Sequence, residues 1–133
     1  MPRWGIWDMT RERALAGSRK VLVVDDNIDA ANMTADVLRM FGINVAVAYG
    51  GVEALAAAES ERPDVVFLDL GMPVMDGYAV AQALRASPAF GRLRIIALTA
   101  WGDQASRDKT KAAGFDLHLT KPAQISELVE LAS

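Results

Sequence analysis

The sequence predicts an α/β domain in which a doubly wound, five-stranded parallel sheet carries helices on both faces. Five short runs rich in Val, Ile and Leu alternate along the chain with five segments of helical character. The run at residues 65–69 is apolar up to a final Asp, as in strands that are buried on both faces. Regular alternation of strand and helix favours parallel strands joined by right-handed crossovers.

Composition limits the function classes. The 133 residues are 52% hydrophobic and 23% charged, which is typical of a single soluble domain. The absence of Cys excludes disulfides, thiolate zinc sites and cysteine nucleophiles, and the one His leaves little room for a histidine metal cluster. A net charge of −3 argues against a nucleic-acid surface. No apolar stretch approaches the roughly 20 residues of a membrane span, so we expect a cytoplasmic protein.

The first eighteen residues are predicted to lie outside the domain, which we expect over residues 19–133. They combine Trp4, Ile6 and Trp7 with several basic side chains and have no clear period. One interpretation is a frayed terminus or a short helix laid on the domain. The alternative is a docking element for a partner or a membrane surface.

The first strand is predicted over residues 21–24, where four apolar residues precede an acidic pair. The helix predicted over residues 28–41 ends at Gly42, a typical helix stop. Its expected apolar face consists of residues at helical spacing: Ile28, Ala31, Val37, Leu38 and Phe41.

The next three elements are a strand, a helix and the central strand. Residues 43–48 alternate like a strand, and the Ala-rich residues 52–60 predict a short helix that ends before a Pro. The central strand, 64–69, ends where Gly71 and Pro73 break the chain.

The C-terminal half repeats the pattern. Helical periodicity predicts a helix over residues 77–86, a second, strongly charged one over 102–113 and a final one over 123–133. Apolar runs predict strands over residues 93–98 and 115–119.

Polar side chains gather at the carboxyl ends of the predicted strands: Asp25, Asp26, Asp69, Thr99 and Lys121. In parallel sheets these ends share one edge, where ligands bind. Taken alone, Asp69 could simply cap a turn. Three converging carboxylates without His or Cys suit Mg²⁺, and a lysine and a hydroxyl beside them suit phosphoryl transfer to a carboxylate.

Four segments in this order carry a family resemblance: Val23-Val24-Asp25-Asp26-Asn27, Leu68 through Gly77, Ala97-Leu98-Thr99-Ala100 and Thr120-Lys121-Pro122. Over residues 20–133 the chain resembles the receiver domains of two-component response regulators, either a single-domain receiver or the receiver of a hybrid kinase. The resemblance implies the flavodoxin-like fold of that family.

The resemblance also implies a role for each matching residue. Asp69 would be the phosphorylated nucleophile, assisted by Thr99 and Lys121. Mg²⁺ would bind to Asp26, the Asp69 side chain and the Gly71 carbonyl, with Asp25 acting partly through water. Thr99 would move to contact the phosphoryl group, and the Lys121–Pro122 peptide bond would be cis.

Two positions depart from the common pattern. His118 stands where many receivers place a switch Tyr or Phe, so it is either a switch residue or a partly exposed strand residue. Trp101 lies two residues after Thr99. We predict that Trp101 slows loss of the phosphoryl group by shielding it; the alternative is an outward side chain on a protein-binding surface.

The resemblance implies a phosphorylation-activated signalling switch rather than an enzyme. Its partners would be a sensor histidine kinase or a histidine phosphotransfer protein and a downstream protein, without direct nucleic-acid binding. The changing surface would comprise the fourth helix, fifth strand and last helix, where a second copy could also bind. Aspartate-dependent phosphohydrolases usually carry a second Asp where Gly71 stands, which counts against that alternative. The complete acidic and lysine set counts against a degenerate, purely binding receiver.

Overall fold

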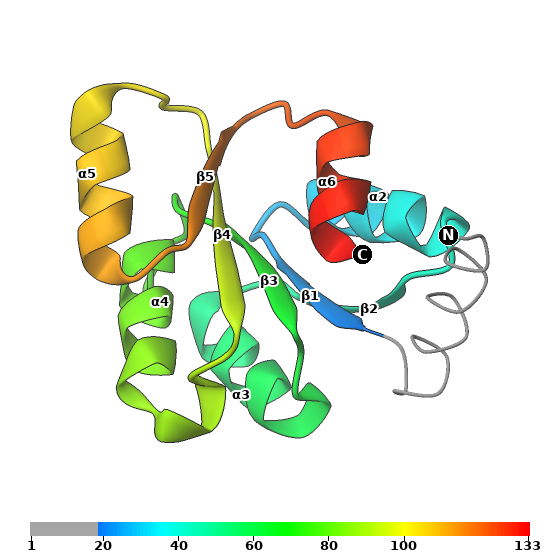
Figure 1. Ribbon diagram of the computed structural model, residues 1–133, viewed down its shortest axis with the longest axis horizontal. Helices are drawn as coiled ribbons and strands as arrows, with labels where there is room; N and C mark the ends of the chain where they lie inside the picture. The colour runs from blue at the N-terminus through cyan, green and yellow to red at the C-terminus, as the bar shows by residue number, and fades with distance from the viewer. Residues whose placement is uncertain (1–18) are drawn as a thin grey trace, which may run out of the picture.

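The computed structural model describes residues 19–133 and confirms the predicted fold class (Figure 1). The strands are β1 (Lys20–Val24), β2 (Asn44–Ala48), β3 (Val65–Asp69), β4 (Arg94–Thr99) and β5 (Leu117–Thr120). The helices are α2 (Ile28–Met40), α3 (Gly51–Glu61), α4 (Gly77–Ala86), α5 (Gln104–Ala113) and α6 (Ile125–Ala132). A 3₁₀ turn, η1 (Pro88–Phe90), precedes β4. Among the described residues, no helix combines the length and apolar character needed to cross a membrane.

The sheet is parallel throughout, with the strand order β2-β1-β3-β4-β5. In the centre, Leu68 of β3 pairs with Val24 of β1 on one side and with Ala97 of β4 on the other. From β1 the chain moves outward to β2 and then returns to β3 on the opposite side of β1. The strand order therefore reverses at β1 and β3, and in such sheets ligands usually bind beyond the carboxyl ends of the strands at this point.

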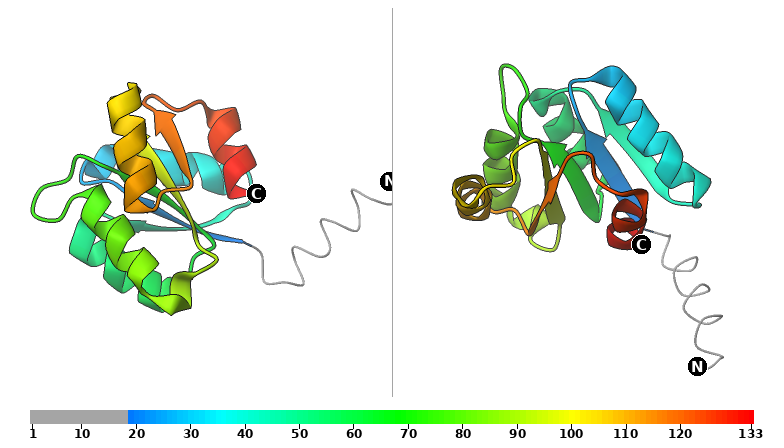
Figure 2. Two further views of the ribbon diagram at one scale, coloured as in Figure 1. Left: turned by 60° about the vertical axis from the view of Figure 1, so that its left-hand side comes forward. Right: turned by 90° about the horizontal axis from the view of Figure 1, so that it is seen from above.

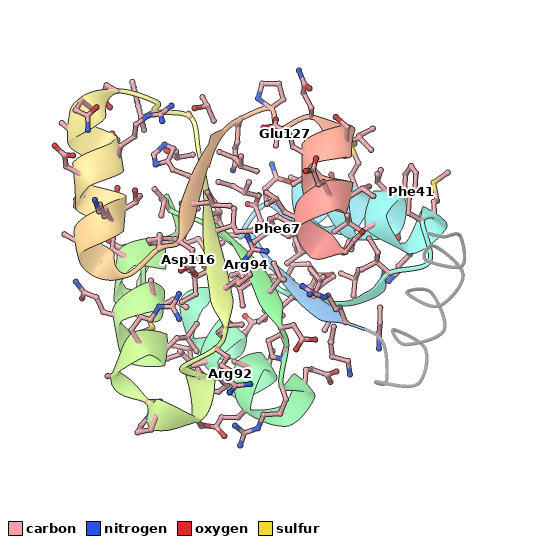
Figure 3. All side chains as sticks on the ribbon, viewed as in Figure 1. Phe41, Phe67, Arg92, Arg94, Asp116 and Glu127 are labelled. Atoms are coloured by element: carbon pink, nitrogen blue, oxygen red, sulfur yellow. The ribbon has the colours of Figure 1, made fainter. Side chains whose placement is uncertain are left out.

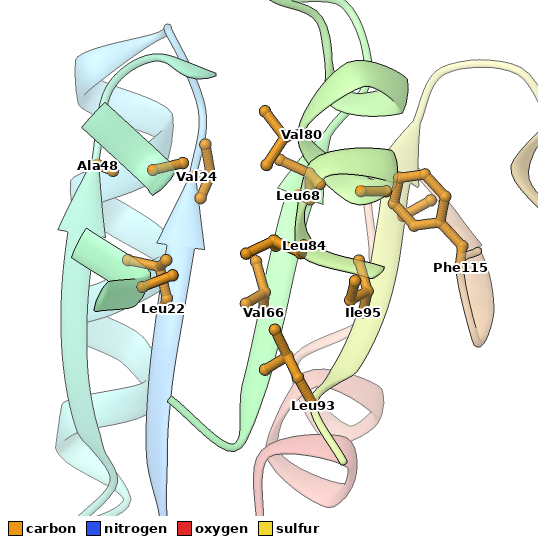
Figure 4. Close-up of a cluster of buried hydrophobic side chains, with 14 of the residues drawn as sticks. Leu22, Val24, Ala48, Val66, Leu68, Val80, Leu84, Leu93, Ile95 and Phe115 are labelled. Carbon is orange, nitrogen blue, oxygen red and sulfur yellow. The ribbon is translucent and has the colours of Figure 1, made fainter. Parts of the chain in front are cut away.

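Helices cover both faces of the sheet. Figures 1 and 2 show α2 and α6 on one side and α3 and α4 on the other. On the α3–α4 side the buried residues include Leu22, Val66 and Leu84 (Figure 4). On the α2–α6 side Phe67 is fully buried, in the same apolar cluster as Leu128. β3 therefore contributes alternate side chains to two separate apolar layers, which explains its uninterrupted apolar sequence.

Side-chain caps fix the starts of two helices close to the strand ends. The Asn27 side chain accepts a hydrogen bond from Ala30 N at 3.0 Å and caps α2. Asp76 accepts one from Ala79 N at 2.9 Å and caps α4. Such caps contribute about 1 kcal/mol each. They set where the chain leaves the loops after β1 and β3.

The expected apolar face of the first helix was partly wrong. Ile28 is 54% exposed and Phe41 is 59% exposed, and Figure 3 shows Phe41 at the periphery, beside the end of α2. The buried face consists of Ala31, Ala35 and Leu38. Small alanines let this helix lie close to the sheet, so the larger side chains at its two ends extend past the edge of the contact.

Some element boundaries also differ from the prediction. β5 begins at Leu117, because the N–H of Phe115 bonds to Thr110 O and that residue still belongs to the turn after α5. α5 begins at Gln104 and α6 at Ile125, each about two residues later than predicted. The predicted terminal segment 1–18, with Trp4 and Trp7, lies outside the described residues.

Candidate functional site

The structure brings the predicted residues together at one edge of the sheet. Asp25 follows β1, Asp69 is the last residue of β3, and Thr99 is the last residue of β4. Lys121 follows β5, and its backbone N–H bonds to Thr99 O at 2.7 Å. Because that bond ties Lys121 to the end of β4, its side chain starts beside the carboxylates.

Three carboxylates form the centre of the site. One oxygen from each of Asp25, Asp26 and Asp69 lies within 4.8 Å of the others. Asp25 and Asp69 are 6% and 7% exposed, whereas Asp26 is open to solvent. Asp25 also accepts a hydrogen bond from Asn27 N at 3.0 Å, which fixes its orientation.

Lys121 is the cation of the cluster. Its Nζ lies 3.0 Å from Asp69 Oδ1 and 3.4 Å from Asp25 Oδ2. Three carboxylates and one ammonium group leave a local charge of −2. The donor set, oxygen ligands of high charge without nitrogen or sulfur, therefore fits a hard divalent cation such as Mg²⁺.

Burial, together with the neighbouring charges, sets the pKa values of two groups in the cluster. Burial raises the pKa of Asp25, and the negative charge of Asp69 raises it further, while the Asn27 N–H and Lys121 lower it. Burial lowers the pKa of Lys121, but the hydrogen bond and charge of Asp69, together with the charge of Asp25, outweigh it and leave the pKa raised. Lys121 is therefore held protonated beside a carboxylate that is costly to ionise.

Thr99 is 4% exposed and joins the site to the loop after β4. Its Oγ1 accepts a hydrogen bond from Trp101 N at 3.1 Å. A hydroxyl that accepts one bond still has its own proton to donate. The Trp101 side chain is 71% exposed.

His118 faces this loop and α5. Its Nε2 lies 2.8 Å from Trp101 O, and its Nδ1 lies 3.2 Å from Thr110 Oγ1. His118 is half-buried, and Leu117, the residue before it in β5, is 40% exposed.

A profile of the response regulator receiver domain matches residues 21–133. The chain belongs to this family. It resembles the chemotaxis protein CheY4 of Vibrio cholerae with a TM-score of 0.80 and 34% identity, covering 85% of this chain and 94% of CheY4. It also resembles the receiver domain of the sensor histidine kinase PA1611 of Pseudomonas aeruginosa, whose structure has a magnesium ion coordinated in the active site cleft. That TM-score is 0.78 at 33% identity, covering 86% and 93% of the two chains.

The receiver domain is also similar to parts of longer regulators. The transcriptional regulatory protein PrrA of Mycobacterium tuberculosis is 41% identical over 112 residues, which cover 84% of this chain and 47% of PrrA. The chain therefore spans about half the length of the transcriptional regulators that it matches.

Two parts of this receiver domain were not predicted as functional. A Cβ added at Gly77 would lie 2.5 Å from Asp69 O and 2.9 Å from Leu70 Cα, so Gly77 lets α4 start directly against the backbone of Asp69. The sequence signal for this close approach was the pair Asp76-Gly77 at the start of the helix. The second is Thr110, whose contact with His118 has no signal in the sequence because it depends on how α5 packs. The Lys121–Pro122 peptide bond is cis, as predicted.

Proposed function

We propose that this receiver domain accepts a phosphoryl group on Asp69 and acts as a signalling switch in a two-component phosphorelay. The observation that carries the proposal is the position of Lys121 Nζ, 3.0 Å from Asp69 Oδ1, beside two further carboxylates. This arrangement supplies a nucleophile, a fixed positive charge and a cation site within one small volume. Those are the requirements of phosphoryl transfer, which depends on positioning and charge neutralisation.

The donor would be a phosphohistidine of a sensor histidine kinase or a phosphotransfer protein. A carboxylate oxygen of Asp69 attacks the phosphorus atom and forms a P–O bond while the P–N bond breaks. The electron pair of the P–N bond returns to the imidazole nitrogen, which takes up a proton. Lys121 then contacts the phosphoryl oxygens that have come to lie next to Asp69.

Asp25, Asp26 and Asp69 would hold Mg²⁺, together with the Gly71 carbonyl. The bound ion would neutralise negative charge on the phosphoryl oxygens. Without a divalent cation the cluster has one lysine for three carboxylates, so a doubly negative phosphoryl group would be repelled. Gly71 is exposed, and a Cβ at its position would meet no atom within 4 Å. This side of the site is therefore accessible to the donor.

The response would pass through Thr99 and His118 to the surface formed by α5, β5 and α6. Three large apolar side chains on or beside this surface support the proposal: Trp101, Leu117 and Ile125 are 71%, 40% and 52% exposed. Exposed apolar side chains are typical of protein-binding surfaces where they form a continuous patch. A downstream protein or a second copy of the chain would bind here. We further propose that residues 19–133 form the receiver domain, separate from 1–18, and act in the cytoplasm.

The test is phosphorylation with acetyl phosphate and Mg²⁺, followed by intact mass. We expect wild type to gain the mass of one phosphoryl group, only with Mg²⁺ present, and to lose it with hydroxylamine, which cleaves acyl phosphates. Asp69→Asn should gain nothing. Asp36→Asn is the matched control, because Asp36 is an exposed carboxylate on α2 that pairs with Arg39. Equal labelling of wild type and Asp69→Asn would contradict the proposed acceptor.

A further inference from the structure

Thr110 is a buried polar residue outside the proposed acceptor site. Among the described residues, the buried polar or charged side chains are Asp25, Asp69, Thr99 and Thr110. The first three belong to the site, whereas Thr110 lies on α5 and is 2% exposed. A buried hydroxyl costs stability unless it is hydrogen-bonded, so its partners indicate what it does there.

Thr110 has two partners. Its Oγ1 lies 2.9 Å from Arg107 O, one turn earlier on α5, and 3.2 Å from His118 Nδ1 on β5. The first is a local contact that threonines in helices often make. The second joins α5 to the neighbouring strand through side chains alone.

The protons of this pair can be assigned from the partner of the other ring nitrogen. Trp101 O can only accept, so His118 Nε2, 2.8 Å away, must carry a hydrogen. In a neutral imidazole Nδ1 is then an acceptor, and it needs the hydroxyl proton of Thr110. Since the hydroxyl has one proton, Arg107 O and His118 compete for it.

The backbone of Trp101 connects this contact to the acceptor site. The N–H of Trp101 is donated to Thr99 Oγ1 at 3.1 Å, while the C=O of Trp101 faces His118. The loop after β4 is thus held by Thr99 through one backbone group and by His118 through another. If Thr99 turns toward a phosphoryl group, it releases the Trp101 N–H. The loop is then held by His118 at Trp101 O and by Arg107 Nε, which donates to Gly102 O at 3.0 Å.

We infer that Thr110 is a positioning residue that holds the His118 ring in its Nε2–H form against the Trp101 carbonyl and so couples the loop after β4 to α5. The inference rests on the proposed function for its role in signalling. The hydroxyl of Thr110 does not touch the reacting atoms. Its effect is to orient His118, the side chain that contacts both the loop and the helix.

The test uses the fact that the chain contains one histidine, so its imidazole signals need no assignment. We would record long-range ¹H–¹⁵N spectra of the full chain at a pH where the ring is neutral. The ¹⁵N shifts tell a protonated ring nitrogen from an unprotonated one. Wild type and Thr110→Ser, which keeps the hydroxyl, should show almost entirely the Nε2–H form. Thr110→Val has nearly the same shape but no hydroxyl, so Nδ1 loses its donor and the ring is free to turn away from Trp101 O. This variant should therefore show a mixture of the two forms.

The response to activation is the second readout. We would add beryllium fluoride with Mg²⁺, which mimics an acyl phosphate, and follow the His118 signals. These should shift in wild type and Thr110→Ser, and by less than half as much in Thr110→Val, while phosphorylation of Asp69 by acetyl phosphate stays within twofold of wild type. Thr34→Val on α2, on the opposite face of the sheet, is the matched control and should behave as wild type in every measurement.

The outcomes separate this inference from the proposed function. If neither wild type nor any Thr110 variant gains a phosphoryl group, the proposed function fails. The tautomer measurement then still decides whether Thr110 positions His118. If Thr110→Val is folded, phosphorylated and indistinguishable from wild type in tautomer and response, the positioning role is overturned. A Thr110→Ser protein that behaves like Thr110→Val would also overturn it, because the hydroxyl would then have no special role.

Discussion

Replacing Gly77 by Ala tests whether the close approach between α4 and Asp69 is a requirement of the fold. Sequence reasoning alone expects a gain, because Ala favours a helix over Gly by up to about 1 kcal/mol. In the structure the added Cβ would lie 2.5 Å from Asp69 O, 2.9 Å from Leu70 Cα and 3.1 Å from Asp69 C. These are backbone atoms, so rotation of a side chain cannot relieve the contact.

The backbone must shift, at a cost of about 1 to 3 kcal/mol for an overpacked site. At the first position of a helix the propensity gain is smaller than in the interior, so the net expectation is a loss of about 1 to 2 kcal/mol. For a domain of this size that loss lowers Tm by roughly 3 to 8 °C. The displaced backbone belongs to Asp69, so phosphorylation by acetyl phosphate should also slow.

The assay is urea unfolding followed by circular dichroism, with acetyl phosphate labelling in parallel. Gly91→Ala is the matched control, because its Cβ would meet only Pro88 O at 3.6 Å and its φ is −60°. That variant should be neutral or gain up to about 1 kcal/mol. An increase in stability for Gly77→Ala similar to that of Gly91→Ala would refute the argument from close approach.

Three further predictions concern the site and its loops. The pKa of Asp25 is raised above its ordinary value of 3.8, chiefly by burial. The stability that this carboxyl group contributes is therefore complete below pH 3.8 and is lost as the pH rises through its pKa in the folded protein. Asp25→Asn should raise the urea midpoint of the Mg²⁺-free protein at pH 7, and it should weaken the added stabilisation by Mg²⁺, which for wild type is about 2.7 kcal/mol at 100 times Kd. An unchanged midpoint would contradict this. Trp101→Ala should shorten the aspartyl-phosphate half-life several-fold; an unchanged half-life would mean that the exposed indole serves only surface contacts. Val74 has a φ of 68°, which is costly for a β-branched residue, and its side chain is fully exposed. Val74→Gly should therefore stabilise the domain by about 1 kcal/mol. Thermal unfolding measures this, and a lower Tm for the variant would argue against backbone strain at Val74.

Much of the candidate site could be predicted because its residues sit at the ends of strands. A strand end is marked locally by an apolar run that stops, and parallel strands bring their ends to one edge. Asp25, Asp69 and Lys121 were found in this way, and the structure brings them into contact. Their roles in phosphoryl transfer remain predictions.

The sequence by itself determined the succession of strands and helices, the parallel sheet and the polar edge, because these follow from local periodicity and from the handedness of crossovers. Tertiary structure decided which apolar residues are buried, because Ile28 is exposed while Ala31 is not. The helical spacing of apolar residues identifies the face that packs on the sheet, but it does not say how far along the helix that contact extends. It also decided the fit of Gly77 against Asp69 and the pairing of Thr110 with His118. Both contacts join different elements of the fold, so they exist only once those elements have packed.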